Sequence, residues 1–278
     1  MNQILVLVQN TIKKEFTNKL LIFMFAVTVL IIYVLGNISD FVVKNISMTG
    51  PGGQQSASAV SAAAGGYSFA AFFFLIQSWN ALLAVLVTIG GIGSDYRYGV
   101  ITQILSQPLP RWKYLVSRIA GSYLIILAYY VISLALAFVF LSGNFSAQSL
   151  TPTLAGSFAV AQLVILFYIT VSVIMALYVP QKIAFFLVFI LALFLHYANY
   201  HAGALLASGE SVLAKPVLVL ATFAFPQIGT ISKFSSFSFT PDASYSAAEV
   251  LGHSALFLAM LAAWFVGACF AYRRKDIS

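Results

Sequence analysis

Residues 154–178, LAGSFAVAQLVILFYITVSVIMALY, contain no charged side chain. A helix that crosses a bilayer needs roughly 20 consecutive, mostly apolar residues, because the hydrocarbon core is about 30 Å thick. This stretch meets that length, and similar apolar runs recur on both sides of it. It therefore predicts an all-α polytopic membrane protein.

The composition of the whole chain agrees with this interpretation. The chain has 278 residues, of which 61% are hydrophobic and 8% charged, and its mean hydropathy is +0.97. A soluble globular domain has about 25% charged residues. The net charge of +7 lies at the edges of the apolar runs, so it indicates orientation in a bilayer and not nucleic-acid binding. The single cysteine, Cys269, excludes an internal disulfide and any Cys-based metal cluster.

We expect six membrane spans and treat residues 1–278 as one transmembrane domain. The spans are predicted at about 20–36, 69–92, 117–141, 154–178, 183–200 and 249–271.

Three segments outside these spans carry their own predictions. Residues 2–18 alternate apolar and polar side chains at helical spacing, which predicts an amphipathic helix on the membrane interface. Residues 37–68 are rich in Gly, Ser and Ala and predict a flexible loop. Residues 212–226 are apolar but short and interrupted by proline, so we expect a re-entrant or interfacial element between the fifth and sixth spans.

The distribution of basic residues predicts the orientation. With the N-terminus in the cytoplasm, eleven of the fourteen Lys and Arg residues lie on the cytoplasmic side. Cytoplasmic loops carry the excess of Lys and Arg in membrane proteins. Both termini are therefore expected in the cytoplasm, which requires an even number of spans. A seventh span at 212–226 would move the basic C-terminal end outside.

The connection between the second and third spans, 93–116, is compact and basic. Residues 95–106 can form a short amphipathic helix with Asp95 and Arg97 on its polar face, ended by Pro108 and Pro110. Such a helix can serve simply to anchor the loop at the membrane interface. The alternative is a docking site for a cytoplasmic partner.

Several kinds of chemistry are not expected. The chain lacks a Walker A sequence, so we do not expect it to bind ATP, and it lacks the residue patterns of hydrolytic enzymes. His196 and His201 are five residues apart and would point about 140° apart on a helix, so no metal site is expected. The scarcity of charge within the predicted spans argues against an ion-coupled secondary transporter.

An ordered set of residues follows the second predicted span: Asp95, Gly99, Leu105, Ser106, Pro108, Arg111 and Arg118. The chain also has a basic KKEFTNK entry helix, FPQIG after the fifth span and a YRRKDIS ending. These features resemble the membrane subunits of ATP-binding-cassette (ABC) exporters of the type-2 permease family, above all the branch linked to multicopper-enzyme maturation and gliding motility. That family has an acidic residue, Gly-Thr, a Leu-Leu-Ser-like run, a proline, an arginine and a basic residue opening the third span. Val100 stands here in place of the usual threonine.

The resemblance implies a plasma (inner) membrane permease that pairs with a second permease copy, related or identical. Separate cytoplasmic ABC ATPase subunits would carry the ATP and Mg²⁺, and this chain would be neither an enzyme nor a holder of a cofactor. The resemblance and the scarcity of buried charge together suggest export of an apolar or amphipathic substrate. A non-transporting scaffold that transmits ATPase motion to an envelope machine is the alternative. The implied coupling residues are Asp95, Tyr96, Arg97, Gly99, Ile101, Leu105, Ser106, Pro108, Arg111 and Arg118.

Overall fold

The computed structural model contains helices as its regular elements throughout the described part of the chain. The described residues are 3–16, 19–49, 53–97, 99, 110–141, 152–208, 224–235 and 246–274. The helices are α1 (Gln3–Phe16), α2 (Lys19–Thr49), α3 (Gly53–Arg97), α5 (Arg111–Leu141), α6 (Pro152–Tyr178), α7 (Gln181–Ser208), α9 (Ile228–Ser235) and α10 (Ala247–Arg274). The all-helical prediction is confirmed for these residues.

Five helices are long and apolar enough to cross a membrane within the described ranges. They confirm a multi-pass membrane protein, and their apolar segments are Phe73–Arg97, Trp112–Val139, Gly156–Tyr178, Gln181–Asn199 and Ala247–Tyr272. The first predicted span, 20–36, falls in α2, where the apolar part Leu21–Val34 is shorter than a span requires. The described residues therefore support five spans and leave the sixth as a prediction.

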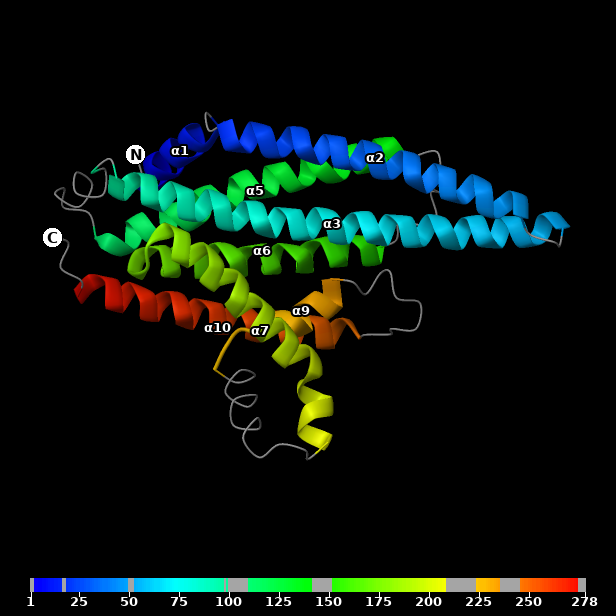
Figure 1. Cartoon of the computed structure of the whole chain (residues 1–278). Coiled ribbons are helices and arrows are strands. Elements are labelled where there is room, and N and C mark those ends of the chain that lie inside the picture. The colour runs from blue at the N-terminus through cyan, green and yellow to red at the C-terminus, as the bar shows by residue number, and fades with distance from the viewer. Residues whose placement is uncertain are drawn as a thin grey trace.

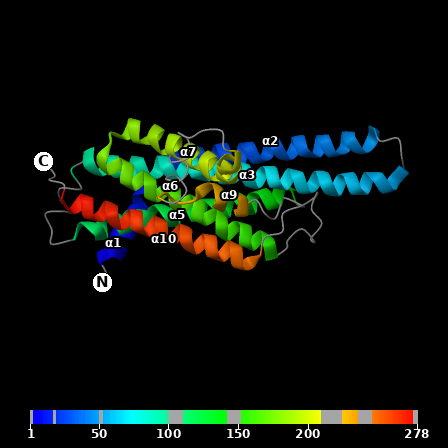
Figure 2. The ribbon, with the colours of Figure 1, turned by 90° about the horizontal axis from the view of Figure 1, so that it is seen from below.

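Helix α6 lies at the centre of the bundle and contacts α3, α5, α7, α9 and α10. Figure 2 shows α6 between α7 and α10. A helix that is apolar all round its circumference favours burial on every side, and α6 has this character. Its Phe167 and Ile165 are fully buried and belong to different hydrophobic clusters of the core. The uncharged stretch 154–178 thus provides the helix around which the others pack.

The N- and C-terminal ends of the chain lie at the same end of the bundle (Figure 1). The connection from α3 to α5 also begins and ends there, and α1 packs across this end against α5. We refer to it as the Asp95 end. At the other end α7 has turned away from the bundle axis, and α9 lies against α6 and α7 (Figure 1).

The prediction of a flexible loop at 37–68 is wrong for most of that segment. Helix α2 continues through Thr49, and α3 begins at Gly53. Ala is the best helix former, Ser and Gly cost only about 0.5–1 kcal/mol each, and an adjoining apolar helix supplies the nucleus. With 45 residues, α3 is about 68 Å long, which is twice the thickness of the hydrocarbon core. The two helices project together beyond the bundle (Figure 1).

Helix α9 was not predicted from the sequence. The expected element at 212–226 falls largely on residues outside the described ranges, and the FPQIG motif instead leads directly into α9. The helix is short, but Ile228, Ile231 and Phe234 are buried against the core. At its start, the backbone N–H of Gly229 donates a hydrogen bond to Oδ1 of Asn199 on α7, at 3.4 Å. Tertiary contacts therefore hold a helix of only eight residues.

The packing of α10 leads to a first prediction. Phe257 is fully buried and its ring centroid lies 6.3 Å from that of Phe167, whereas Phe270 on the same helix is exposed. Phe257→Ala should destabilise the protein by about 2 kcal/mol. That is less than the usual 3–5 kcal/mol of a water-soluble core, because lipid is itself apolar and only packing is lost. Thermal unfolding in detergent measures the loss.

The matched control is Phe270→Ala, which removes an equal volume from the outer face of α10. It should leave the unfolding midpoint almost unchanged. Equal destabilisation by both variants would show that α10 does not present the Phe257 face to α6.

Candidate functional site

A cluster of buried polar and charged side chains lies at the Asp95 end, where α1, α3 and α5 meet. Asp95 on α3 and Arg118 on α5 are exposed by only 2% and 6%, and Glu15 on α1 by 3%. A buried charge is costly unless it is paired and hydrogen-bonded. The partners of these groups therefore decide how the three helices are held.

Asp95 is the centre of the cluster because its carboxylate accepts from three side chains. Lys14 donates to Oδ1 at 2.8 Å, and the hydroxyl of Tyr114 donates to Oδ2 at 2.8 Å. Arg118 also donates to Oδ2 and forms an ion pair with it. The donors come from α1 and α5, so one carboxylate on α3 joins three helices.

Arg118 reaches further groups beside the carboxylate. Its guanidinium donates to the carbonyl of Gly91 at 3.3 Å and to the hydroxyl of Thr11 at 3.5 Å. A Cβ placed on Gly91 would lie 2.9 Å from Oε1 of Glu15 and 3.4 Å from Nη1 of Arg118. The missing side chain of Gly91 therefore allows both charged groups to lie against α3.

The cluster is balanced in charge, since Lys14 and Arg118 oppose Asp95 and Glu15. Such a set is worth little net stability compared with an apolar core, but removal of one member leaves an uncompensated charge, which costs roughly 3–5 kcal/mol. A cavity of about 120 Å³ adjoins it, lined on the polar side by Asn10, Thr11 and Ser117. This volume has room for a few water molecules, whose share of liquid volume is about 30 Å³ each.

The structure brings together only part of the predicted coupling set. Asp95 and Arg118 meet in the cluster, while Tyr96 and Arg97 are exposed at its outer edge. Gly99 makes a turn with φ of 65° and donates its N–H to the carbonyl of Tyr96 at 3.2 Å. Arg111 is the first residue of α5. Four members lie outside the described residues: Ile101, Leu105, Ser106 and Pro108.

The prediction that a separate amphipathic helix starts at Asp95 is wrong at its beginning. Helix α3 continues without a break through Arg97, and Asp95 is buried on its inner side. The carboxylate lies here because its hydrogen-bond donors Lys14, Tyr114 and Arg118 are inside the bundle. In the remainder of that predicted helix, Gly99 makes a turn, and the other residues lie outside the described ranges.

Sequence reasoning also placed α1 on the membrane by its apolar face, yet its polar face is what packs against the protein. Thr11 and Glu15 are buried, Lys14 is half-buried, and Leu5 is exposed. The sequence does contain this polar face: Thr11, Lys14 and Glu15 have the spacing that places them on one side of a helix. It could not be recognised without knowing that Asp95 and Arg118 lie opposite.

A glycine on α5 lets α1 approach closely. A Cβ on Gly121 would lie 2.7 Å from Cγ2 and 2.8 Å from Cβ of Thr11. Real Cβ atoms do not come this close, so α1 would have to move. Small residues at helix contacts allow such close approach in membranes.

Metal binding has no support among the described residues, where no three His, Cys, Asp or Glu side chains come together. His196 is exposed on α7, and the side chain of His201 lies outside the described set.

The buried ion pair gives a second prediction. Arg118→Met should destabilise the protein by roughly 3 kcal/mol because Asp95 loses its guanidinium partner. Asp95→Asn should also destabilise it, and the double variant should lose less than the sum of the two, by at least about 1 kcal/mol. Thermal unfolding of the four proteins in detergent measures this coupling.

Arg97→Met is the control for this cycle, because it makes the same change on an exposed arginine of α3. We expect a change within about 0.5 kcal/mol. Additive losses at Asp95 and Arg118 would contradict the ion pair.

The close contact of α1 with α5 gives a third prediction. Gly121→Ala should displace α1 and lower the unfolding midpoint, although Ala is the better helix former. Gly90→Ala on α3 is the control, since its Cβ would meet nothing within 4 Å. That variant should be neutral or stabilising by about 0.5–1 kcal/mol. The same effect at both positions would show that α1 does not pack on Gly121.

Comparison with known proteins adds one finding. The model of a family described as "Protein of unknown function (DUF2705)" matches residues 52–278. The match begins one residue before α3 and includes Asp95, Arg118 and α9. No curated protein matches the chain.

Proposed function

This chain belongs to the DUF2705 family, and for it we propose the role of a permease subunit in an ABC exporter. In this proposal, separate ATPase subunits bind the Asp95 end, and two permease copies form the path for an apolar or amphipathic substrate. The sixth span, the cytoplasmic position of both termini and the plasma-membrane location are parts of the same proposal.

The observation that carries the proposal is the buried junction around Asp95. The connection between α3 and α5 is bounded by exposed residues, Arg97 on one side and Pro110 and Trp112 on the other. Directly beneath them, Asp95 is bonded to Lys14 and to α5. A force applied to this connection would therefore move α1, α3 and α5 as a unit.

Two further features support the proposal. The segment carries the motif by which the chain resembles type-2 permeases. Asp95 and Arg118, the first and last residues of that motif, form an ion pair. The exposed basic side chain of Arg97, beside this connection, suits a soluble protein partner or anionic lipid headgroups. A scaffold that only transmits ATPase motion would use the same junction, so the transport step needs its own test.

The test is co-purification of the chain with its candidate ABC ATPase in detergent. Asp95 is unsuitable for substitution because it supports the fold, whereas Arg97 is exposed. Arg97→Glu should reduce the retained ATPase by about tenfold, as expected for loss of one charged contact and gain of a repulsive one. Lys182→Glu, the same change at the start of α7, should retain the ATPase.

Two results would contradict the proposal. If the wild-type chain retains no ABC ATPase, the permease assignment fails. If both variants release it equally, the contact depends on general charge and not on the connection between α3 and α5. ATPase activity that increases with an amphipathic substrate would favour the exporter over the scaffold.

A further inference from the structure

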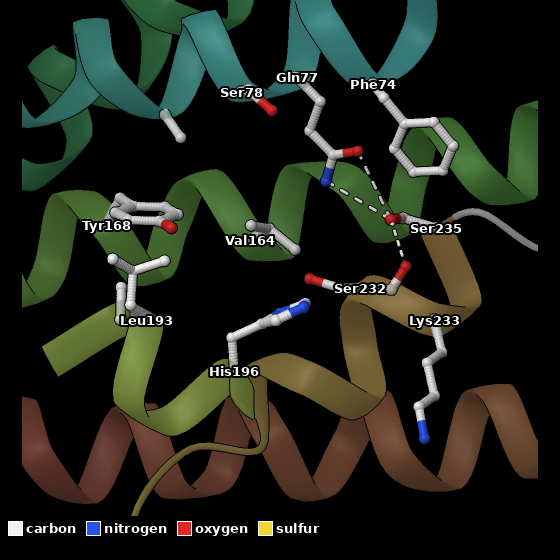
Figure 3. A pocket seen from close by; sticks show the side chains of 12 residues that line it. Phe74, Gln77, Ser78, Val164, Tyr168, Leu193, His196, Ser232, Lys233 and Ser235 are labelled. Atoms are coloured by element: carbon white, nitrogen blue, oxygen red, sulfur yellow. Dashed lines mark hydrogen bonds between the residues drawn. The ribbon is translucent and has the colours of Figure 1, made fainter. Parts of the chain in front are cut away.

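A larger cavity lies far from the Asp95 cluster, between α3, α6, α7 and α9 (Figure 3). Its volume is about 420 Å³, within the range of sites that hold small molecules. Its lining residues are Phe74, Gln77, Ser78, Ala81, Val164, Tyr168, Ala192, Leu193, His196, Ser232, Lys233 and Ser235. Helix α9, which was not predicted from the sequence, supplies three of its polar side chains.

The inner wall of the cavity holds a polar pair with unused hydrogen-bonding capacity. Gln77 is 8% exposed, and its amide meets only the hydroxyl of Ser235, at 3.4 Å and 3.5 Å, among the described residues. That hydroxyl has one proton, which it donates to the carbonyl of Ser232 at 2.8 Å. The amide oxygen of Gln77 is thus left without a good donor, and its NH₂ group has only a long contact. Figure 3 shows this amide directed toward the cavity.

The electrostatic character of the lining favours an anion. Lys233 on α9 provides a positive charge at the edge of the cavity, where its side chain is directed away from the amide of Gln77, and His196 adds an imidazole (Figure 3). Among the described residues that line the cavity, none is acidic. Ser78 and Ser232 add hydroxyl groups that can donate to an anionic oxygen.

The apolar part of the lining is open toward the surface of the bundle. Phe74 and Leu193 are exposed, Leu193 by 69%, whereas Val164 and Ala192 at the inner side are buried. In a membrane-spanning bundle, exposed apolar side chains at the depth of the bilayer face lipid chains. The cavity can therefore be entered sideways from the bilayer.

The depth of the cavity matches a lipid headgroup region. Gln77 precedes Asp95 by 18 residues on α3, which is about 27 Å along the helix. His196 follows Gln181 by 15 residues on α7, or about 22 Å. Gln181 marks the Asp95 end, since its side chain donates to the carbonyl of Ile89 at 3.2 Å. With a hydrocarbon core of about 30 Å, the polar groups lie close to the opposite interface.

We propose that this cavity binds an anionic amphiphile of the bilayer leaflet opposite the Asp95 end. The anionic headgroup accepts from the amide of Gln77 beside His196, the charge of Lys233 attracts it from the edge of the cavity, and an acyl chain leaves between Phe74 and Leu193. The site requires no ATPase and stands independently of the proposed export function.

The experiment measures lipid binding to the purified, delipidated chain in a non-ionic detergent by native mass spectrometry. The probes are phosphatidylglycerol, phosphatidylcholine with the same acyl chains, and inorganic phosphate. We expect wild type to bind phosphatidylglycerol about tenfold more tightly than phosphatidylcholine, the effect of one charge-assisted contact. Lys233→Met should remove this preference, and Gln77→Leu should weaken binding of phosphatidylglycerol several-fold.

Lys182→Met is the matched control, because it removes an exposed lysine at the Asp95 end. It should retain the preference. Ser78→Trp changes an exposed residue at the mouth of the cavity and should reduce binding of both lipids without a loss of thermal stability.

Three outcomes would overturn the proposal. Equal loss in the two lysine variants would indicate non-specific attraction to basic surface. Equal affinity of wild type for the two lipids would show that the cavity does not select an anion. Binding of inorganic phosphate with the same dependence on Lys233 would assign the site to a free anion instead of a lipid.

Discussion

The bundle depends on one buried carboxylate at the junction of three helices. Asp95 accepts from Lys14, Tyr114 and Arg118, so the end of α3 is held to both α1 and α5. In an apolar environment each of these groups is costly when it is separated from the others. The N-terminal helix is therefore an integral part of this end of the protein, although its apolar residues alone suggest a helix that merely rests on a membrane.

Packing supplies the rest of the architecture. Lipid is as apolar as the interior of the bundle, so helices gain little from burying apolar area and associate through close fit and polar contacts. Gly91 and Gly121 provide that fit around the charged cluster, where a Cβ would meet Glu15 or Thr11. In the centre of the bundle, the uncharged helix α6 provides this close fit. Among the described residues, the buried charges Glu15, Asp95 and Arg118 lie at one end of the bundle, because that is where neighbouring helices can satisfy them.

The two ends of the bundle consequently have different chemistry. The Asp95 end has a paired, closed cluster with a small cavity and an exposed basic edge, which suits the transmission of force from a partner. The region near α9 has a wider cavity with a polar inner wall and a mouth toward the bilayer. Helix α6 extends between the two regions and packs on helices that line both.

The sequence by itself determined the all-helical membrane class and the approximate positions of the apolar helices, because length and hydropathy are local properties. It also singled out Asp95 and Arg118, which the structure joins in an ion pair. It misassigned 37–68, since Gly- and Ser-rich composition does not reveal that adjoining helices extend through it. It also missed Glu15, Lys14 and α9. Lys14 bonds to partners that are 80 or more residues away in the sequence. Helix α9 is held by its contacts with α6 and α7. Only the tertiary structure decided them, because a buried charge or an eight-residue helix is stable only where its neighbours are already in place.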